Sequence, residues 1–69
     1  MRQLRRSRAV EEAGYEAGTR TLRIRFRNGG LYDYFDVPSD VYTGLIGDAH
    51  PWTRFGQHIR RTYRHRRLE

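Results

Sequence analysis

The stretch that decides the fold is TLRIRFRNGGLYDYFDV, residues 21–37. In its first half Leu22, Ile24 and Phe26 alternate with arginines, which is the two-residue period of a strand buried on one face. The glycine pair at 29–30 interrupts this pattern, and a second apolar and aromatic run follows it. Two such runs around a short loop that contains glycine predict an antiparallel β-hairpin.

The register of this hairpin decides which side chains are buried. A two-residue turn at Asn28-Gly29 would place Asp33 on the apolar face, where an unpaired carboxylate costs several kcal/mol. A three-residue loop with Gly30 in the left-handed conformation instead pairs Asp33 with Arg25. We therefore predict the three-residue loop. The tyrosines of the second strand then belong to the core: Tyr32 and Tyr34.

Two helices are predicted after the hairpin. The first begins at Pro38 or Ser39, carries an apolar stripe and ends at Gly47, because glycine is a frequent helix stop. A linker at 49–53 follows, and Thr53 is the expected N-cap of the second helix. On that helix the apolar face is formed by Phe55, Ile59 and Tyr63, with Trp52 as a hydrophobic anchor before it. The opposite, polar face is formed by Arg54, Gln57, Arg61 and Arg64.

These elements predict a small α+β fold in which a three-stranded antiparallel sheet, built on the central β-hairpin, packs against two short helices. The third strand is expected near residues 10–15. We expect a flexible basic arm at residues 1–8, a single domain at residues 9–65 and a basic C-terminal tail at residues 66–69. With 69 residues the chain has room for one small domain and none for a large enclosed substrate cavity.

The composition excludes several classes of site. The chain has no cysteine, so it has no disulfide and no cysteine-based zinc site. Its three histidines match no zinc spacing, and we expect neither a metal nor a cofactor. No apolar run approaches the roughly 20 residues of a membrane span, and no hydrophobic signal core follows Met1. We expect a cytoplasmic monomer that does not contact a membrane.

The positive charge of the chain is concentrated in blocks. The formal net charge is +6, and all 14 basic residues are arginine, which a GC-rich genome would also favour over lysine. Codon usage does not choose where the charge lies, so its distribution is more informative. Arginines gather at residues 1–8, 20–27 and 54–69, whereas the acids, apart from Glu69, lie between these blocks.

The arginine blocks indicate a polyanionic partner. The guanidinium group matches the geometry of phosphate in a bidentate way and also stacks on exposed bases. We predict nucleic-acid contacts from the C-terminal block and from one face of the first hairpin strand. The candidate residues are Arg54, His58, Arg60, Arg61, Arg64, Arg66 and Arg67 in the C-terminal block, and Arg23 and Arg25 on the strand.

The order of motifs resembles the KTSC domain, a small module found at the C-terminus of some lysyl-tRNA synthetases and as a stand-alone protein. The resemblance rests on GYEAGTRTLRIRFRNGGLYDYFDVPSDVY and IRRTYRHRRL, and it covers about residues 7–68. One region departs from the family pattern, which has Ser-x-Gly before the last helix and Phe-Asn within it. Here those places read His50-Pro51-Trp52 and Phe55-Gly56. The resemblance implies a role associated with RNA.

We therefore expect a non-enzymatic domain that binds RNA, tRNA-like or otherwise structured, through phosphate contacts from an arginine-rich last helix and tail. One alternative is a protein–protein interaction module whose partner is a tRNA synthetase or a second copy, with the acidic segment 33–48 pairing with basic blocks between chains. Another is a small metal-free ribonuclease in which a histidine such as His58 acts as general base and arginines stabilise the developing charge.

Overall fold

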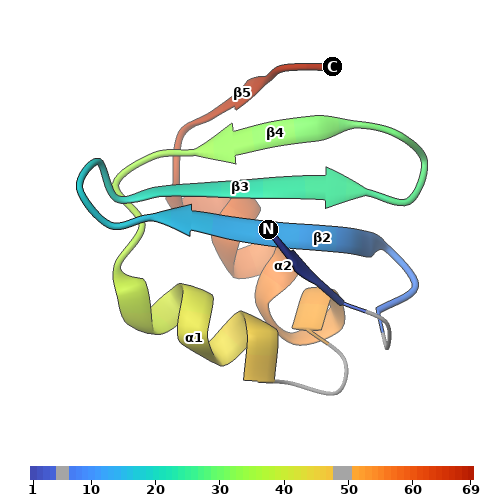
Figure 1. Cartoon of the computed structure of the whole chain (residues 1–69). Helices are drawn as coiled ribbons and strands as arrows, with labels where there is room; N and C mark the ends of the chain where they lie inside the picture. Colours follow the sequence, from blue (N-terminus) through green and yellow to red (C-terminus); the bar gives the residue numbers. More distant parts are fainter. Residues whose placement is uncertain (5–6, 48–50) are drawn as a thin grey trace.

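Two helices cover one face of a five-stranded antiparallel sheet (Figure 1). The computed structural model describes residues 1–4, 7–47 and 51–69, without the side chains of Pro51 and Arg54. The strands lie side by side in chain order. They are β1 (Arg2–Gln3), β2 (Val10–Glu16), β3 (Thr21–Phe26), β4 (Leu31–Tyr34) and β5 (His65–Arg67), and the helices between β4 and β5 are α1 (Ser39–Gly47) and α2 (Pro51–Thr62).

The α+β class and the two helices are confirmed, but the prediction of three strands is wrong. The two strands that the sequence pattern did not predict, β1 and β5, lie at the edges of the sheet. β1 has two residues and β5 has three, and all five side chains are exposed. A short exposed strand carries no apolar alternation, since only its backbone groups take part in the sheet.

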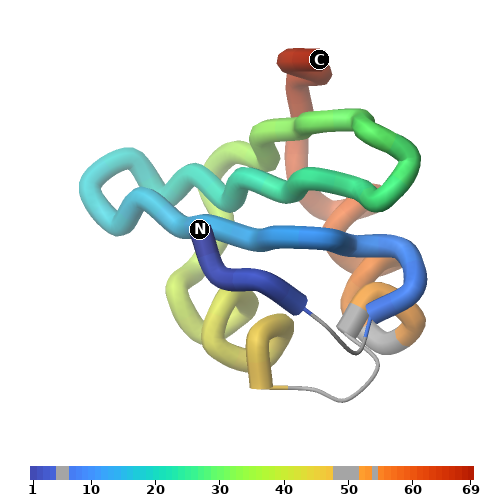
Figure 2. The backbone as a smooth tube through the Cα atoms, turned by 45° about the vertical axis from the view of Figure 1, so that its right-hand side comes forward, coloured from blue at the N-terminus to red at the C-terminus, as the bar shows by residue number. Residues whose placement is uncertain are grey.

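The N-terminal segment was predicted to be a flexible basic arm, and its residues Arg2 and Gln3 pair with β2 as an edge strand of the sheet. Arg2 lies opposite Ala13 of β2, so the chain starts alongside that strand (Figure 2). Leu4 is only 6% exposed and belongs to the core. The guanidinium of Arg27 donates hydrogen bonds to the backbone carbonyl oxygens of Ser7 (2.8 Å) and Leu4 (3.0 Å), which fastens the segment to the hairpin.

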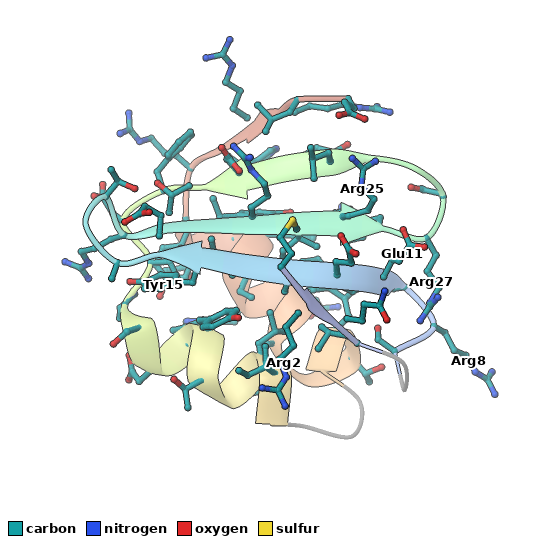
Figure 3. The ribbon with its side chains drawn as sticks, in the orientation of Figure 1. Arg2, Arg8, Glu11, Tyr15, Arg25 and Arg27 are labelled. Atoms are coloured by element: carbon teal, nitrogen blue, oxygen red, sulfur yellow. The ribbon has the colours of Figure 1, made fainter. Side chains whose placement is uncertain are left out.

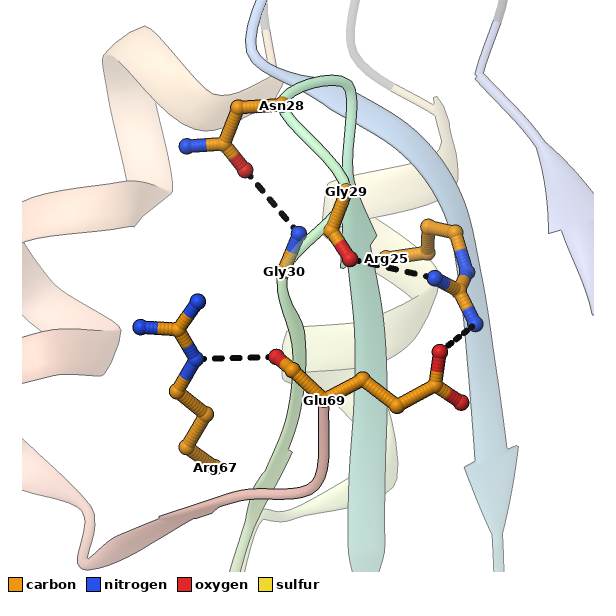
Figure 4. Close-up of polar contacts among 6 residues, drawn as sticks. All are labelled: Arg25, Asn28, Gly29, Gly30, Arg67 and Glu69. Atoms are coloured by element: carbon orange, nitrogen blue, oxygen red, sulfur yellow. Dashed lines mark hydrogen bonds and ion pairs between the residues drawn. The ribbon is translucent and has the colours of Figure 1, made fainter.

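The C-terminal segment, expected to be a tail, also joins the sheet. β5 pairs with β4, and beyond it the amide of Leu68 donates a hydrogen bond to the carbonyl oxygen of Leu31 (2.7 Å). The carboxylate of Glu69 lies 3.2 Å from the guanidinium of Arg25 on β3 (Figure 4). Pairing with β4 therefore continues to the last residues of the chain.

The hairpin loop has the predicted length of three residues, but it lies one position earlier, at residues 27–29. The amide of Phe26 donates to the carbonyl oxygen of Gly30 (2.8 Å), which closes the loop. Gly29, and not the predicted Gly30, takes the left-handed conformation with φ of 100°. The predicted pairing of Asp33 with Arg25 is wrong, because Asp33 lies opposite Arg23.

The core lies between the sheet and the helices. Its fully buried side chains come from four elements and the segment after β4: Val10, Leu22, Ile24, Val37, Leu45 and Ile59. Helix α1 has the predicted bounds from Ser39 to Gly47. Helix α2 begins at Pro51, two residues before the predicted N-cap Thr53, since proline suits the first turn of a helix. Within the described residues no helix is long and apolar enough to cross a membrane.

Candidate nucleic-acid interface

A cleft of about 690 Å³ lies on the helix side of the sheet, where α2 faces the β3–β4 hairpin and β5. Its described lining holds five rings, two side-chain amides and two arginines. We call it the aromatic cleft. The lining residues are Phe26, Tyr32, Tyr34, Trp52 and His65 for the rings, Asn28 and Gln57 for the amides, and Arg60 and Arg61 for the cations.

Strand pairing places the rings of the sheet side by side. Tyr32 lies opposite Ile24 on β3, so both point to the helix side, and Tyr34 points the same way two residues later. On the next strand His65 lies opposite Tyr34, and the two ring centroids are 5.5 Å apart. Arg67 lies opposite Tyr32, and its guanidinium carbon is 5.6 Å from the centre of that ring, a cation–π contact.

Trp52 brings a further ring from the first turn of α2. Its indole meets the ring of Phe26 edge to face at 5.0 Å and lies 6.4 Å from the ring of Tyr34. Tyr34 is only 3% exposed, whereas Trp52 and Tyr32 are half-buried. Tyr32 and Trp52 therefore keep some exposed surface, and both line the aromatic cleft.

The indole of Trp52 lies against Gly56, one turn later on the same helix. A Cβ atom at position 56 would stand 2.8 Å from both Cδ2 and Cε2 of Trp52, closer than two carbon atoms can pack. Gly56 is buried. The glycine therefore allows the tryptophan to lie on the helix surface beside the sheet.

The aromatic cleft is electropositive. Arg60 and Arg61 are exposed and line it, and the described lining contains no carboxylate. Burial raises the pKa of Tyr34, the nearby positive charge of Arg60 acts against that rise, and Tyr32 adds to it. Tyr34 is thus a neutral phenol at physiological pH, and the arginines supply the charge of the site.

The strand arginines lie on the opposite face of the sheet and are paired within the chain. The guanidinium of Arg23 donates to both carboxylate oxygens of Asp33 (2.8 and 3.0 Å), and these contacts raise the pKa of Arg23. Arg25 donates to the carbonyl oxygen of Gly29 (3.2 Å) and pairs with Glu69 (Figure 4). The structure therefore does not bring Arg23 and Arg25 together with the arginines of the cleft.

The other predicted residues are spread over the C-terminal part. His58 is exposed on α2, where its Nδ1 is 3.3 Å from the hydroxyl of Thr62, and it is not among the residues that line the cleft. Arg64 is exposed after α2, and Arg66 lies opposite Asp33. The side chain of Arg54 lies outside the described residues, as does His50. Among the residues that the structure describes, no three histidine or acidic side chains gather as metal ligands would.

Most of the residues that line the aromatic cleft were not among the predicted site residues. Sequence reasoning assigned Tyr32, Tyr34 and Trp52 to the core, and they do pack against it, but they also form the cleft walls. It gave no role to Asn28 or Gln57 in binding. The amide of Asn28 holds its place because its oxygen accepts a hydrogen bond from the amide of Gly30 (3.0 Å). A loop amide of this kind carries no sequence signal for ligand binding.

Two comparisons with known proteins, one with a family model and one with a solved structure, agree on one family. The family model of the KTSC domain matches residues 6–63. The crystal structure of a KTSC domain protein from Yersinia pestis superposes with a TM-score of 0.84 and 25% sequence identity, over 91% of this chain and 89% of that one. A protein from Tsukamurella paurometabola is 40% identical over 40 residues, which is 58% of this chain and 60% of that protein. The match with this relative thus spans less than two thirds of its length.

Proposed function

The chain belongs to the KTSC domain family, and we propose that it is a non-enzymatic module that binds structured RNA such as tRNA. One observation carries this proposal: Arg60 and Arg61 line the same cleft as the half-buried rings of Tyr32 and Trp52. Arginine is suited to phosphate, and aromatic rings are suited to exposed bases. An RNA loop offers both groups within one nucleotide.

The charges of the described residues favour this region over the other face of the sheet. Arg23 and Arg25 are already neutralised by Asp33 and Glu69, so contact with phosphate there would have to break ion pairs. Arg60, Arg61 and Arg67 lie on the helix side, with Arg67 over the ring of Tyr32. The pairing of Asp33 within the chain also removes one acid from those proposed to contact a second chain.

The test is a titration of fluorescently labelled tRNA, followed by anisotropy at several salt concentrations. The double variant Arg60→Gln/Arg61→Gln is compared with Arg2→Gln/Arg8→Gln, which lowers the net charge by the same amount. Arg2 and Arg8 are exposed and lie on the β1 side of the sheet, away from β5 (Figure 3). If the two cleft arginines together neutralise one or two phosphates, the first variant should lose about 0.7–1.8 from the slope of log Kd against log salt. The control should keep most of its slope.

Two results would contradict the proposal. Absence of binding at about 50 mM salt would end it, since counterion release favours association most strongly at low salt. Equal losses in the two double variants would show that only the net charge matters and that the cleft is not the site. Gel electrophoresis of the RNA after incubation checks the non-enzymatic part: the RNA should stay intact, and cleavage that is lost in His58→Ala would favour the ribonuclease.

A further inference from the structure

The size of the aromatic cleft restricts what can enter it. About 690 Å³ is within the range of sites for small molecules, roughly 300–1,000 Å³. The whole molecule measures only 27 × 25 × 22 Å, so a nucleic-acid duplex can lie across its surface but cannot enter the cleft. In a duplex the faces of the bases are covered by stacking, so aromatic walls can only meet a base that is unpaired.

The polar groups of the cleft come from two parts of the chain, the hairpin loop and α2. On the hairpin, the oxygen of Asn28 is held by the amide of Gly30, and the amide nitrogen points to the side where α2 lies (Figure 4). On the helix, Gln57 lines the cleft together with Arg60 and Arg61. Side-chain amides offer the donors and acceptors that the edges of bases need. The two arginines favour an anionic ligand and disfavour a cation.

From these observations we propose that the aromatic cleft holds a single unpaired nucleotide of the bound RNA. The base lies against the rings of Tyr32 and Trp52, with its edge within reach of Asn28 and Gln57. Its phosphate is bound by Arg60 and Arg61. This inference rests on the proposed RNA-binding function, and it adds that binding requires a nucleotide outside a duplex.

Trp52 makes the inference directly measurable because it is the chain's single tryptophan and lines the cleft. Its intrinsic fluorescence is recorded while the wild-type protein is titrated with AMP, adenosine or ribose 5-phosphate. AMP should quench the fluorescence saturably, since a stacked base lies against the indole. Adenosine, which lacks the phosphate, should bind several-fold more weakly, and ribose 5-phosphate, which lacks the base, should leave the fluorescence unchanged. In Arg60→Gln/Arg61→Gln, AMP should bind no better than adenosine.

A second pair of variants tests the stacking wall with RNA itself. Tyr32→Leu removes the ring and keeps an apolar side chain, whereas Tyr32→Phe keeps the ring. Stacking on one aromatic side chain predicts a loss of about fivefold or more in RNA affinity for Tyr32→Leu and wild-type affinity for Tyr32→Phe. Circular dichroism of both variants checks that they are folded. A blunt-ended duplex should bind more weakly than a single strand of the same length.

The outcomes separate this inference from the proposed function. If tRNA binds in a way that depends on salt and on Arg60 and Arg61, but AMP does not quench Trp52 fluorescence, the nucleotide pocket is refuted and RNA binding stands. If AMP quenches the fluorescence and no RNA binds, free nucleotides are the ligand, and RNA as the source of the nucleotide is refuted. Equal affinity for single strand and duplex would also overturn the inference, because the cleft would then have no part in binding.

Discussion

The contact between Trp52 and Gly56 predicts that the effect of Gly56→Ala on the free energy of unfolding depends on the residue at position 52. In an ordinary helix interior, replacing glycine by alanine stabilises by about 1 kcal/mol. In Gly56→Ala the new Cβ would stand 2.8 Å from two indole carbons, well inside the normal contact distance of about 3.5–4.0 Å. Overpacking of this kind costs about 1–3 kcal/mol. We therefore expect Gly56→Ala to leave the free energy of unfolding unchanged or to lower it by up to about 2 kcal/mol.

The same substitution should be stabilising once the indole is gone. In a Trp52→Leu background the Cβ no longer meets a ring at that distance, and the gain of about 1 kcal/mol from helix propensity remains. The double-mutant cycle should therefore show a coupling energy of about 1–3 kcal/mol between the two positions. Urea unfolding followed by circular dichroism gives all four free energies without depending on tryptophan fluorescence. A stabilisation of equal size in both backgrounds would refute the close packing of Trp52 on Gly56.

Three further predictions follow from the fold. Leu4→Ala should lower the free energy of unfolding by about 2 kcal/mol or more, since Leu4 is buried, and an unchanged thermal melt would show a detached N-terminus. Asp33→Asn should lower the midpoint of urea unfolding, because the charge on its two bonds to half-exposed Arg23 is lost, whereas an unchanged midpoint would mean that water replaces them. Burial raises the pKa of Tyr34, so the unfolded chain releases that proton first and stability should fall above about pH 10. The stability of Tyr34→Phe should fall less steeply with pH. Identical profiles for the variant and the wild type would contradict the raised pKa of Tyr34.

The alternation at residues 22–26 was sufficient to predict the hairpin and its two faces, but not its register. Pairing Asp33 with Arg25 or with Arg23 keeps the carboxylate on the same face of the sheet, because both pairings have the same parity. The choice between them depends on which glycine enters the loop and on the partner of Arg25. That partner is Glu69, 44 residues later in the chain, and it reaches β3 only because β5 pairs with β4. Local sequence reasoning has no access to such a contact.

The aromatic cleft was not predicted for a related reason. Periodicity assigns Tyr32 and Tyr34 to the helix side of the sheet, and this is where they lie. Whether that side is completely covered depends on where α2 crosses it and on a fifth strand whose residues are all exposed. His65 reaches the cleft only as part of that strand. The direction of a side chain could thus be predicted from the sequence, but the space left in front of it could not.

The same contact gives a reason for the departure of this chain from the family pattern. Where the KTSC pattern has a glycine before the last helix and an asparagine within it, this chain has Trp52 and Gly56. Because the indole lies on Gly56, the large residue at 52 requires a small one at 56. Tyr32 and Tyr34 match the family pattern, whereas Trp52, which forms another wall of the cleft, does not. A relative that keeps the glycine would have the tyrosine wall without the indole. If a base stacks on Trp52 as proposed, the cleft of that relative should hold the base less tightly.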